Sequence, residues 1–125
     1  MKHHHERKIR PNAPPGLCCR GRIWIEKDGE TYLGVGRIVL LTKIKEMGSI
    51  SKAAKSMQMS YKRAWDLVDA MNRHAGQPLV ATCKGGKGGG GATLTAKGEE
   101  IVKEFNMLLG QFHQFLDEKT IELHW

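Results

Sequence analysis

The glycine-rich stretch GGKGGGGATLT (85–95) restricts the fold of this chain more than any other segment. Glycine weakens the interiors of helices and strands, so six glycines gathered around Lys87 predict a loop. Residues 78–83 before the loop and 92–94 after it have the composition of two short strands. A hairpin with a thin glycine tip is therefore predicted, and the backbone N–H groups of such a tip can approach a phosphate closely.

Two other glycine-rich structures fit this stretch poorly. A P-loop needs Ser or Thr directly after its lysine, whereas Gly88 follows Lys87 here. A dinucleotide-binding fingerprint needs a buried parallel strand before it and an acidic partner after it, and neither frames the stretch. Since no catalytic constellation is evident elsewhere in the sequence either, we expect that the protein is not an enzyme.

Three helices are predicted before this hairpin. Apolar residues recur at every third position between Val35 and Met47, and Gly48 ends that helix. A short helix is predicted over 52–57, and Ser60 can cap a longer one that reaches about Ala75. The longer helix has one buried stripe, made of Ala64, Leu67, Val68 and Met71.

Two further elements are predicted nearer the ends. Apolar runs at 23–25 and 31–33 flank Asp28-Gly29, which predicts a small hairpin because its turn needs positive φ. Thr95 can cap a final helix that reaches about Asp117. That helix carries an apolar seam suited to a dimer contact, formed by Ile101, Phe105, Leu108, Phe112 and Phe115.

Length and charge set the class of protein. A chain of 125 residues suits one domain, expected over 22–118, after a flexible basic arm (1–21) and before a tail (119–125). The net charge of +7 is concentrated in the front and middle of the chain, while the C-terminal part is acidic. This asymmetry indicates a surface that faces a polyanion and a second surface that does not.

The remaining sequence signals concern compartment and metals. We expect a cytoplasmic protein with no membrane partner, because the sequence has neither a signal peptide nor a long apolar run. The odd set of Cys18, Cys19 and Cys83 implies no disulfide framework, and we expect Cys83 to be a buried small residue of the second strand pair. His3, His4 and His5 lack ligand partners at metal-site spacing, so we expect no metal site.

The order helix, short helix, turn, longer helix and hairpin is that of a winged helix-turn-helix. We therefore expect a mainly α fold with small β hairpins, in which the 60–75 helix enters a major groove and the glycine hairpin is the wing. Two motifs, GSISKAAKSMQMSYKRAWDLVDAMN (48–72) and GGKGGGGATLTAKG (85–98), make residues 23–116 resemble the N-terminal DNA-binding domain of the ModE-type molybdate-responsive transcriptional regulators.

The resemblance implies a homodimer that pairs through its first and last helices and binds a two-fold-related site on double-stranded DNA. The expected dimer interface then adds Ile38 and Leu41 of the first helix to the seam of the last one. Full-length members also carry C-terminal molybdate-binding modules, whereas this sequence ends at Trp125. We accordingly expect no cofactor and no molybdate site: either the chain is a stand-alone binding domain, or an effector is read by a separate protein or not at all.

The expected DNA-binding residues lie at the start of the 60–75 helix and on the wing. They are Ser60, Tyr61, Lys62, Arg63, Trp65, Asp66, Lys84, Lys87 and Thr93. Ser60 can be a helix cap as well as a phosphate contact, and Trp65 can stack on DNA or pack against the wing. Asp66 can accept from a cytosine amino group, but it and Asp69 are also spaced to pair with Lys62 and Arg73.

Other functions stay open at this point. A winged helix can dock a partner protein, and the outward carboxylates of Asp66 and Asp69 are the feature in favour of such a module. A nucleotide-holding enzyme and direct oxyanion sensing at a dimer seam are weaker alternatives, since no dedicated residues support either.

Overall fold

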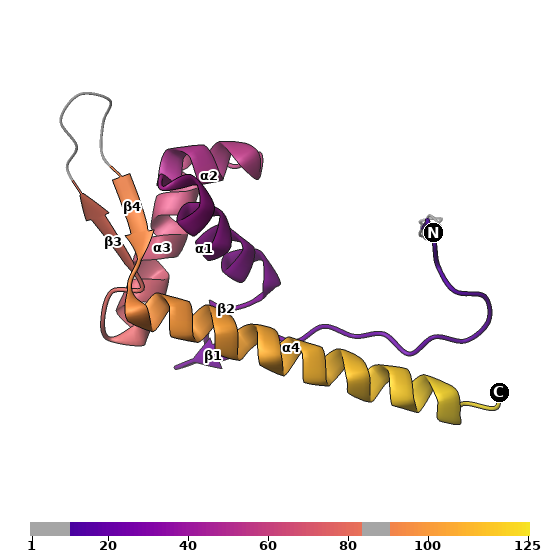
Figure 1. Ribbon diagram of the computed structural model, residues 1–125. Coiled ribbons are helices and arrows are strands. Elements are labelled where there is room, and N and C mark those ends of the chain that lie inside the picture. Colours follow the sequence, from indigo (N-terminus) through magenta and orange to yellow (C-terminus); the bar gives the residue numbers. More distant parts are fainter. Residues whose placement is uncertain (1–10, 84–90) are drawn as a thin grey trace, which may run out of the picture.

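A computed structural model describes residues 11–83 and 91–125 of the protein. In chain order the elements are β1 (Ile25–Lys27), β2 (Glu30–Leu33), α1 (Val35–Met47), α2 (Ile50–Ser56), α3 (Tyr61–Ala75), β3 (Val80–Cys83), β4 (Gly91–Leu94) and α4 (Ala96–Glu122). The helices α1, α2 and α3 form one group beside the β3–β4 hairpin, and α4 extends well beyond that group (Figure 1). The expected winged helix-turn-helix fold is confirmed.

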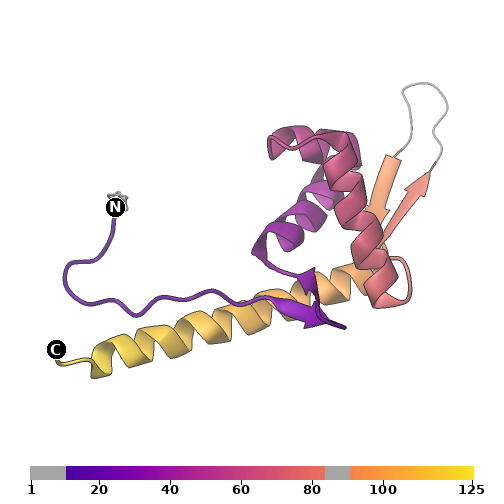
Figure 2. The same cartoon turned by 180° about the vertical axis from the view of Figure 1, so that it is seen from behind.

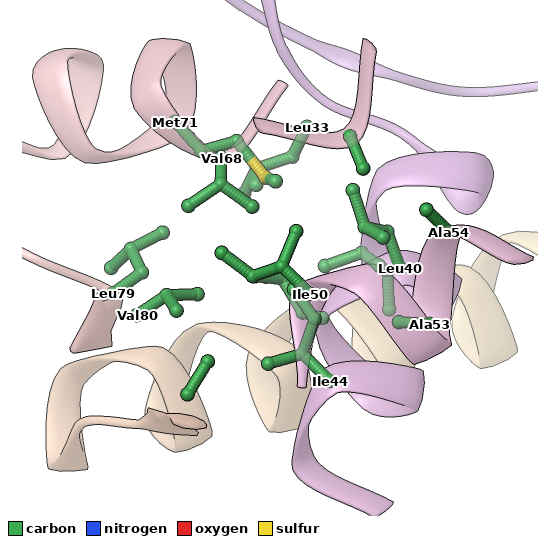
Figure 3. Close-up of a cluster of buried hydrophobic side chains, with 14 of the residues drawn as sticks. Leu33, Leu40, Ile44, Ile50, Ala53, Ala54, Val68, Met71, Leu79 and Val80 are labelled. Atoms are coloured by element: carbon green, nitrogen blue, oxygen red, sulfur yellow. The ribbon is translucent and has the colours of Figure 1, made fainter. Parts of the chain in front are cut away.

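The core lies where α1 meets α2, α3 and the base of the wing (Figure 3). Leu40, Leu41 and Ile44 of α1 are fully buried, because this helix is covered on more than one side. The predicted stripe of α3 supplies Ala64, Val68 and Met71, whereas α4 supplies Phe105. Burying such side chains contributes about 2 kcal/mol each and fixes the orientation of α3.

Local sequence signals set the helix boundaries. The hydroxyls of Ser49, Ser60 and Thr95 each accept a backbone N–H in the first turn of α2, α3 and α4 respectively. Gly48 and Gly76 end α1 and α3 in the left-handed conformation that favours glycine. The predicted bounds of α1 and α3 are therefore confirmed, although α1 starts at Gly34 without a side-chain cap.

The hairpins differ from the prediction mainly in their ends. In the first, Asp28 and Gly29 have φ of 54° and 80°, as the predicted turn requires, although its first strand begins at Ile25 rather than at position 23. In the wing, β3 pairs antiparallel with β4, from Val80–Leu94 to Cys83–Gly91. Cys83 is exposed, so its expected burial is wrong: only Val80 of β3 lies over the core, and the later residues project past it.

The last helix is longer than predicted. It continues to Glu122, so most of the expected tail is helical. The segment before β1 runs alongside it in both views (Figures 1 and 2), where the Cys19 N–H donates to Thr120 Oγ1 at 2.7 Å. The part of the expected flexible arm next to β1 is thus bound to α4.

Candidate nucleic-acid interface

The first two turns of α3 present basic and aromatic side chains to solvent. Tyr61, Lys62 and Arg63 are all exposed, and they follow directly after the Ser60 cap. The opposite side of α3 is held in the core, so this outer face is displayed on a fixed support. Ser60 Oγ accepts from the Arg63 N–H at 3.1 Å, which leaves its own O–H free to donate to a phosphate.

Two ion pairs cross the outer face of α3. Lys62 Nζ lies 2.9 Å from Asp66 Oδ2, and Arg73 Nε lies 4.0 Å from Asp69 Oδ2. The expectation that these carboxylates pair within the helix is confirmed. Exposed pairs of this kind contribute only about 0.5 kcal/mol, so a DNA phosphate can readily replace Asp66 as the partner of Lys62.

Other cations near this face have no such partner. Within residues 11–83 and 91–125, no carboxylate forms an ion pair with Arg63, or with Lys52 and Lys55 of α2. All three side chains are exposed. Positive charge is therefore left uncompensated on the two helices of the helix-turn-helix, which suits a polyanion.

Two aromatic rings stand one turn apart at the start of α3. Tyr61 is 54% exposed and Trp65 is 45% exposed. Trp65 is thus only partly packed, and its open part is available for stacking or for contact with a sugar.

The wing is tied to α3 by a residue that the sequence analysis did not single out. Asn72 Oδ1 accepts from the backbone N–H groups of Leu79 at 2.8 Å and Val80 at 3.3 Å. On the other strand, the Ala92 N–H donates to the Gly48 carbonyl at 2.9 Å. These bonds fix the wing base relative to both helices. An Asn directly beside the apolar stripe of α3 is the only sequence signal for this role.

Of the three wing residues expected to contact DNA, only one lies in the described part of the structure. Thr93 lies exposed on β4, opposite Ala81, on the described part of the wing. Lys84 and Lys87 fall outside the described residues.

The expected dimer residues divide into two groups. Ile38, Leu41 and Phe105 are 4%, 0% and 2% exposed, so these three are core residues of the single chain and offer no surface to a second one. This corrects their assignment to the interface. The others keep accessible surface on α4: Ile101 and Phe112 are partly buried, and Leu108 and Phe115 are exposed.

Further apolar side chains, which were not predicted from the sequence, are exposed on α1 and α4. On α1 they are Val35 and Val39, one turn apart, which lie beside the buried positions. On α4, Met107 and Ile121 are exposed as well. The helix α1 therefore does expose apolar side chains, but they are Val35 and Val39 rather than the predicted Ile38 and Leu41.

Among residues 11–83 and 91–125, no group of three or more His, Cys, Asp or Glu side chains is arranged to hold a metal ion. None of the helices in that part of the chain is long and apolar enough to cross a membrane. His3, His4 and His5 lie outside it.

Comparison with known proteins gives consistent matches. Residues 36–99 match the model of the bacterial regulatory helix-turn-helix proteins of the lysR family. The chain is 40% identical over 110 residues to the molybdenum-pterin-binding protein MopB of Rhodobacter capsulatus, covering 86% of this chain and 40% of that protein. It is 41% identical over 103 residues to the molybdenum transport protein ModE of Azotobacter vinelandii, covering 82% and 38%. The resemblance to ModE-type regulators is confirmed.

Two further matches bear on function and fold. The chain is 46% identical over 72 residues to the DNA-binding transcriptional dual regulator ModE of Escherichia coli K12, covering 58% of this chain and 28% of that protein. Among solved structures, the LysR family transcriptional regulator VV2_1132 matches with a TM-score of 0.51 at 24% identity, over 64% of this chain and 26% of that one. The chain thus spans less than half the length of these relatives.

Proposed function

Because the chain belongs to the lysR family of bacterial regulatory helix-turn-helix proteins, we propose that it is a DNA-binding transcriptional regulator that binds a two-fold-related site as a homodimer. One observation carries the proposal. The first turns of α3 display Tyr61, Lys62 and Arg63 on a helix whose inner side is buried and whose C-terminal half is bonded to the wing through Asn72. Such a helix can lie in a major groove without losing its packing.

In this proposal each expected DNA-binding residue has a definite task. Lys62 exchanges Asp66 for a phosphate, and Arg63 contacts the backbone or a base edge without breaking any existing pair. The Ser60 hydroxyl donates to a phosphate, while Tyr61 and Trp65 contact sugars and bases at the groove edge. The wing supplies Thr93, Lys84 and Lys87 to the flanking backbone.

The exposed apolar side chains on α1 and α4 support the homodimer. Val35 and Val39 belong to one helix and Leu108 and Phe115 to the other, the two helices through which ModE-type regulators are expected to pair. A two-fold dimer reads half-sites about 34–36 Å apart, one turn of DNA. The regulator would act on DNA in the bacterial cytoplasm, and neither a metal nor a molybdate site is part of the proposal.

The test is the affinity for duplex DNA upstream of the protein's own gene cluster and for a scrambled duplex, measured by fluorescence anisotropy at several salt concentrations. The Lys62→Ala/Arg63→Ala double variant should lose at least about tenfold in affinity and about two in the slope of log affinity against log salt. The matched control, Lys103→Ala/Lys119→Ala on α4, removes the same charge and should bind like the parent.

Three results would contradict the proposal. The double variant could bind as tightly as the parent, or the control could lose as much as the double variant. Weak binding of both duplexes by the parent, without salt dependence, would instead favour the docking of a partner protein. Sedimentation equilibrium on the free protein tests the dimer separately.

A further inference from the structure

The N-terminal part of the chain contacts both the recognition helix and the far half of α4. The segment before β1 runs beside α4 in both views, and the β1–β2 hairpin that follows it packs against α3 (Figures 1 and 2). The far half of α4 extends well beyond the group formed by α1, α2 and α3 (Figure 1). The N-terminal segment therefore connects the recognition helix to the part of the chain that lies farthest from it.

The hairpin is bonded to the last turn of the recognition helix. Lys27 Nζ donates to the His74 carbonyl at 2.6 Å, one of the carbonyls that a helix leaves without a partner at its C-terminus. His74 Nε2 lies 2.9 Å from Glu30 Oε1, and the Tyr32 ring meets the His74 ring edge-on, with the two centroids 5.9 Å apart. Because Leu33 at the end of the hairpin is buried in the core, the hairpin holds α3 from a fixed position.

The segment before the hairpin contacts α4 at two points. Thr120 Oγ1 donates to the Leu116 carbonyl at 2.9 Å, which leaves its lone pairs free to accept from the Cys19 N–H at 2.7 Å. Gly21 lies directly on a second side chain of α4, since a Cβ added to it would be 3.0 Å from Phe112 Cζ. Phe112 and Thr120 are about 12 Å apart along the helix. The segment thus follows α4 over more than two turns.

The position of Thr120 makes its bond sensitive to the direction of α4. The helix leaves the core at its Thr95 cap, and Thr120 lies about 37 Å from that cap along the helix. A tilt of α4 by about 10° would move Thr120 by about 6 Å relative to the core. An N–H···O bond tolerates a donor–acceptor distance of only about 2.7–3.2 Å. The contacts of Cys19 and Gly21 therefore oppose a tilt of α4 away from the N-terminal segment.

We propose that residues 19–33 form a brace that fixes the direction of the far half of α4 relative to α3, with Thr120 and Lys27 as its positioning residues. The inference rests on the proposed homodimer, because pairing through α4 makes this direction determine how the two recognition helices are oriented relative to each other. Neither positioning residue contacts DNA in this proposal. The brace makes the dimer selective for one arrangement of half-sites, which a loosely held α4 would not do.

Pulsed electron paramagnetic resonance measures the direction of α4 without DNA. One spin label on α3, introduced by Asp69→Cys, and one on the far half of α4, introduced by Glu118→Cys, report the distance between the two helices; both positions are exposed. The three native cysteines are replaced by serine, and the brace keeps its bond because residue 19 donates its backbone N–H. Labelled chains are mixed with an excess of unlabelled chains, so that only distances within one chain are observed.

The variants remove the contacts of the brace one end at a time. Gly21→Val/Thr120→Val removes both contacts with α4 and should at least double the width of the distance distribution, and Lys27→Met should widen it from the other end. Thr42→Val is the matched control. The Thr42 hydroxyl donates to the Ile38 carbonyl at 2.9 Å within its own helix, as Thr120 does, but it accepts no bond from another element in the described part of the chain. The control should keep the width of the parent.

DNA binding supplies a readout that a merely structural role would not change. Inserting one base pair at the centre of the duplex that the parent binds moves the half-sites apart by about 3.4 Å and rotates them by about 34°. The parent should lose at least about tenfold in affinity on this insertion, whereas Gly21→Val/Thr120→Val should lose about threefold or less, because its recognition helices adjust to the new arrangement. Circular dichroism checks that each variant is folded, and Thr120→Val alone replaces the double variant if that one is not.

Three results would overturn the inference. The distance distribution of Gly21→Val/Thr120→Val could be as narrow as that of the parent, or Thr42→Val could widen it equally, which would make the effect local to one helix. Equal losses on insertion in the parent and the variant would show that the brace does not control the arrangement of half-sites. If the parent binds neither its own upstream duplex nor the scrambled one, the proposed function has failed instead, and the label distances alone then decide whether residues 19–33 hold α4.

Discussion

Gly98 offers the sharpest test of how the wing and the long helix are joined. It is buried in the first turn of α4, directly against Leu79, the residue before β3. A Cβ added there would overlap the carbonyl oxygen of Leu79 and lie 3.1 Å from its carbonyl carbon. That oxygen also accepts from the Thr95 N–H at 2.9 Å. Gly98→Ala must therefore push α4 away from Leu79, to which its N-terminal cap residue is bonded.

Three contributions determine how much Gly98→Ala changes the free energy of unfolding. Overpacking against backbone costs about 1–3 kcal/mol, and weakening the Thr95–Leu79 bond costs about 1 kcal/mol. In the opposite direction, replacing glycine by alanine in a helix stabilises the folded state by about 0.5–1 kcal/mol. We expect Gly98→Ala to lower the free energy of unfolding by about 2–3 kcal/mol, which for a chain of this size lowers the melting temperature by about 10 °C.

Gly110 is the matched control, because it lies in the same helix with nothing within 4 Å of an added Cβ. Gly110→Ala should raise the melting temperature by about 2–4 °C, since only the helix term remains. Circular dichroism melts of the three proteins at two concentrations measure both shifts and show any dependence on association. Shifts of the same sign in both variants would refute the close packing of Gly98 on Leu79.

Three further predictions concern single residues. Asn72→Ala should destabilise the protein by about 2–3 kcal/mol, because it leaves the N–H groups of Leu79 and Val80 without their acceptor. Urea denaturation measures this change in the free energy of unfolding, and a loss below about 1 kcal/mol would contradict the prediction. Gln58→Gly should stabilise the protein by about 0.5–1 kcal/mol in the same assay, because Gln58 has a φ of 56°, in the left-handed region, between α2 and α3. A loss of stability would contradict that backbone conformation. Burial raises the pKa of Tyr32 despite the opposing charge of Lys97, so the neutral ring stabilises the fold below pH 10 and that contribution is lost as pH rises through the folded-state pKa. Melting temperatures between pH 8 and 11 should therefore fall more steeply for the parent than for Tyr32→Phe, and parallel curves would show that Tyr32 is not responsible.

The sequence predicted those parts of the fold that have local signals. Gly48 and the Ser60 cap place the boundaries of α1 and α3, because stop and cap residues act within one turn of the helix. The stripe of α3 likewise identified its buried side. The basic first turn of the same helix could be placed from sequence, since it lies opposite that stripe and next to the cap.

The errors arose where the partner of an apolar side chain lies far away in sequence. Periodicity identifies Ile38 and Leu41 as apolar but does not say whether they pack on their own chain or on a second one, and here the core takes both. The predicted apolar seam of α4 ends at Phe115 whereas the helix ends at Glu122, because residues 117–122 are polar apart from Ile121 and carry the Lys119–Glu122 pair. The bond between Cys19 and Thr120 joins residues 101 positions apart, which no local pattern reveals.

The length of α4 gives the helix a mechanical property. It has 27 residues and is therefore about 40 Å long, and it is anchored at one end by the Thr95 cap and Gly98. A tilt of about 10° at that anchor would displace the far end of α4 by about 7 Å relative to the recognition helix of the same chain. Successive base pairs are about 3.4 Å apart, so a displacement of this size is comparable to the length of two base pairs. The packing of Gly98 on Leu79 would then be the pivot that sets the distance between a recognition helix and the far end of its own α4.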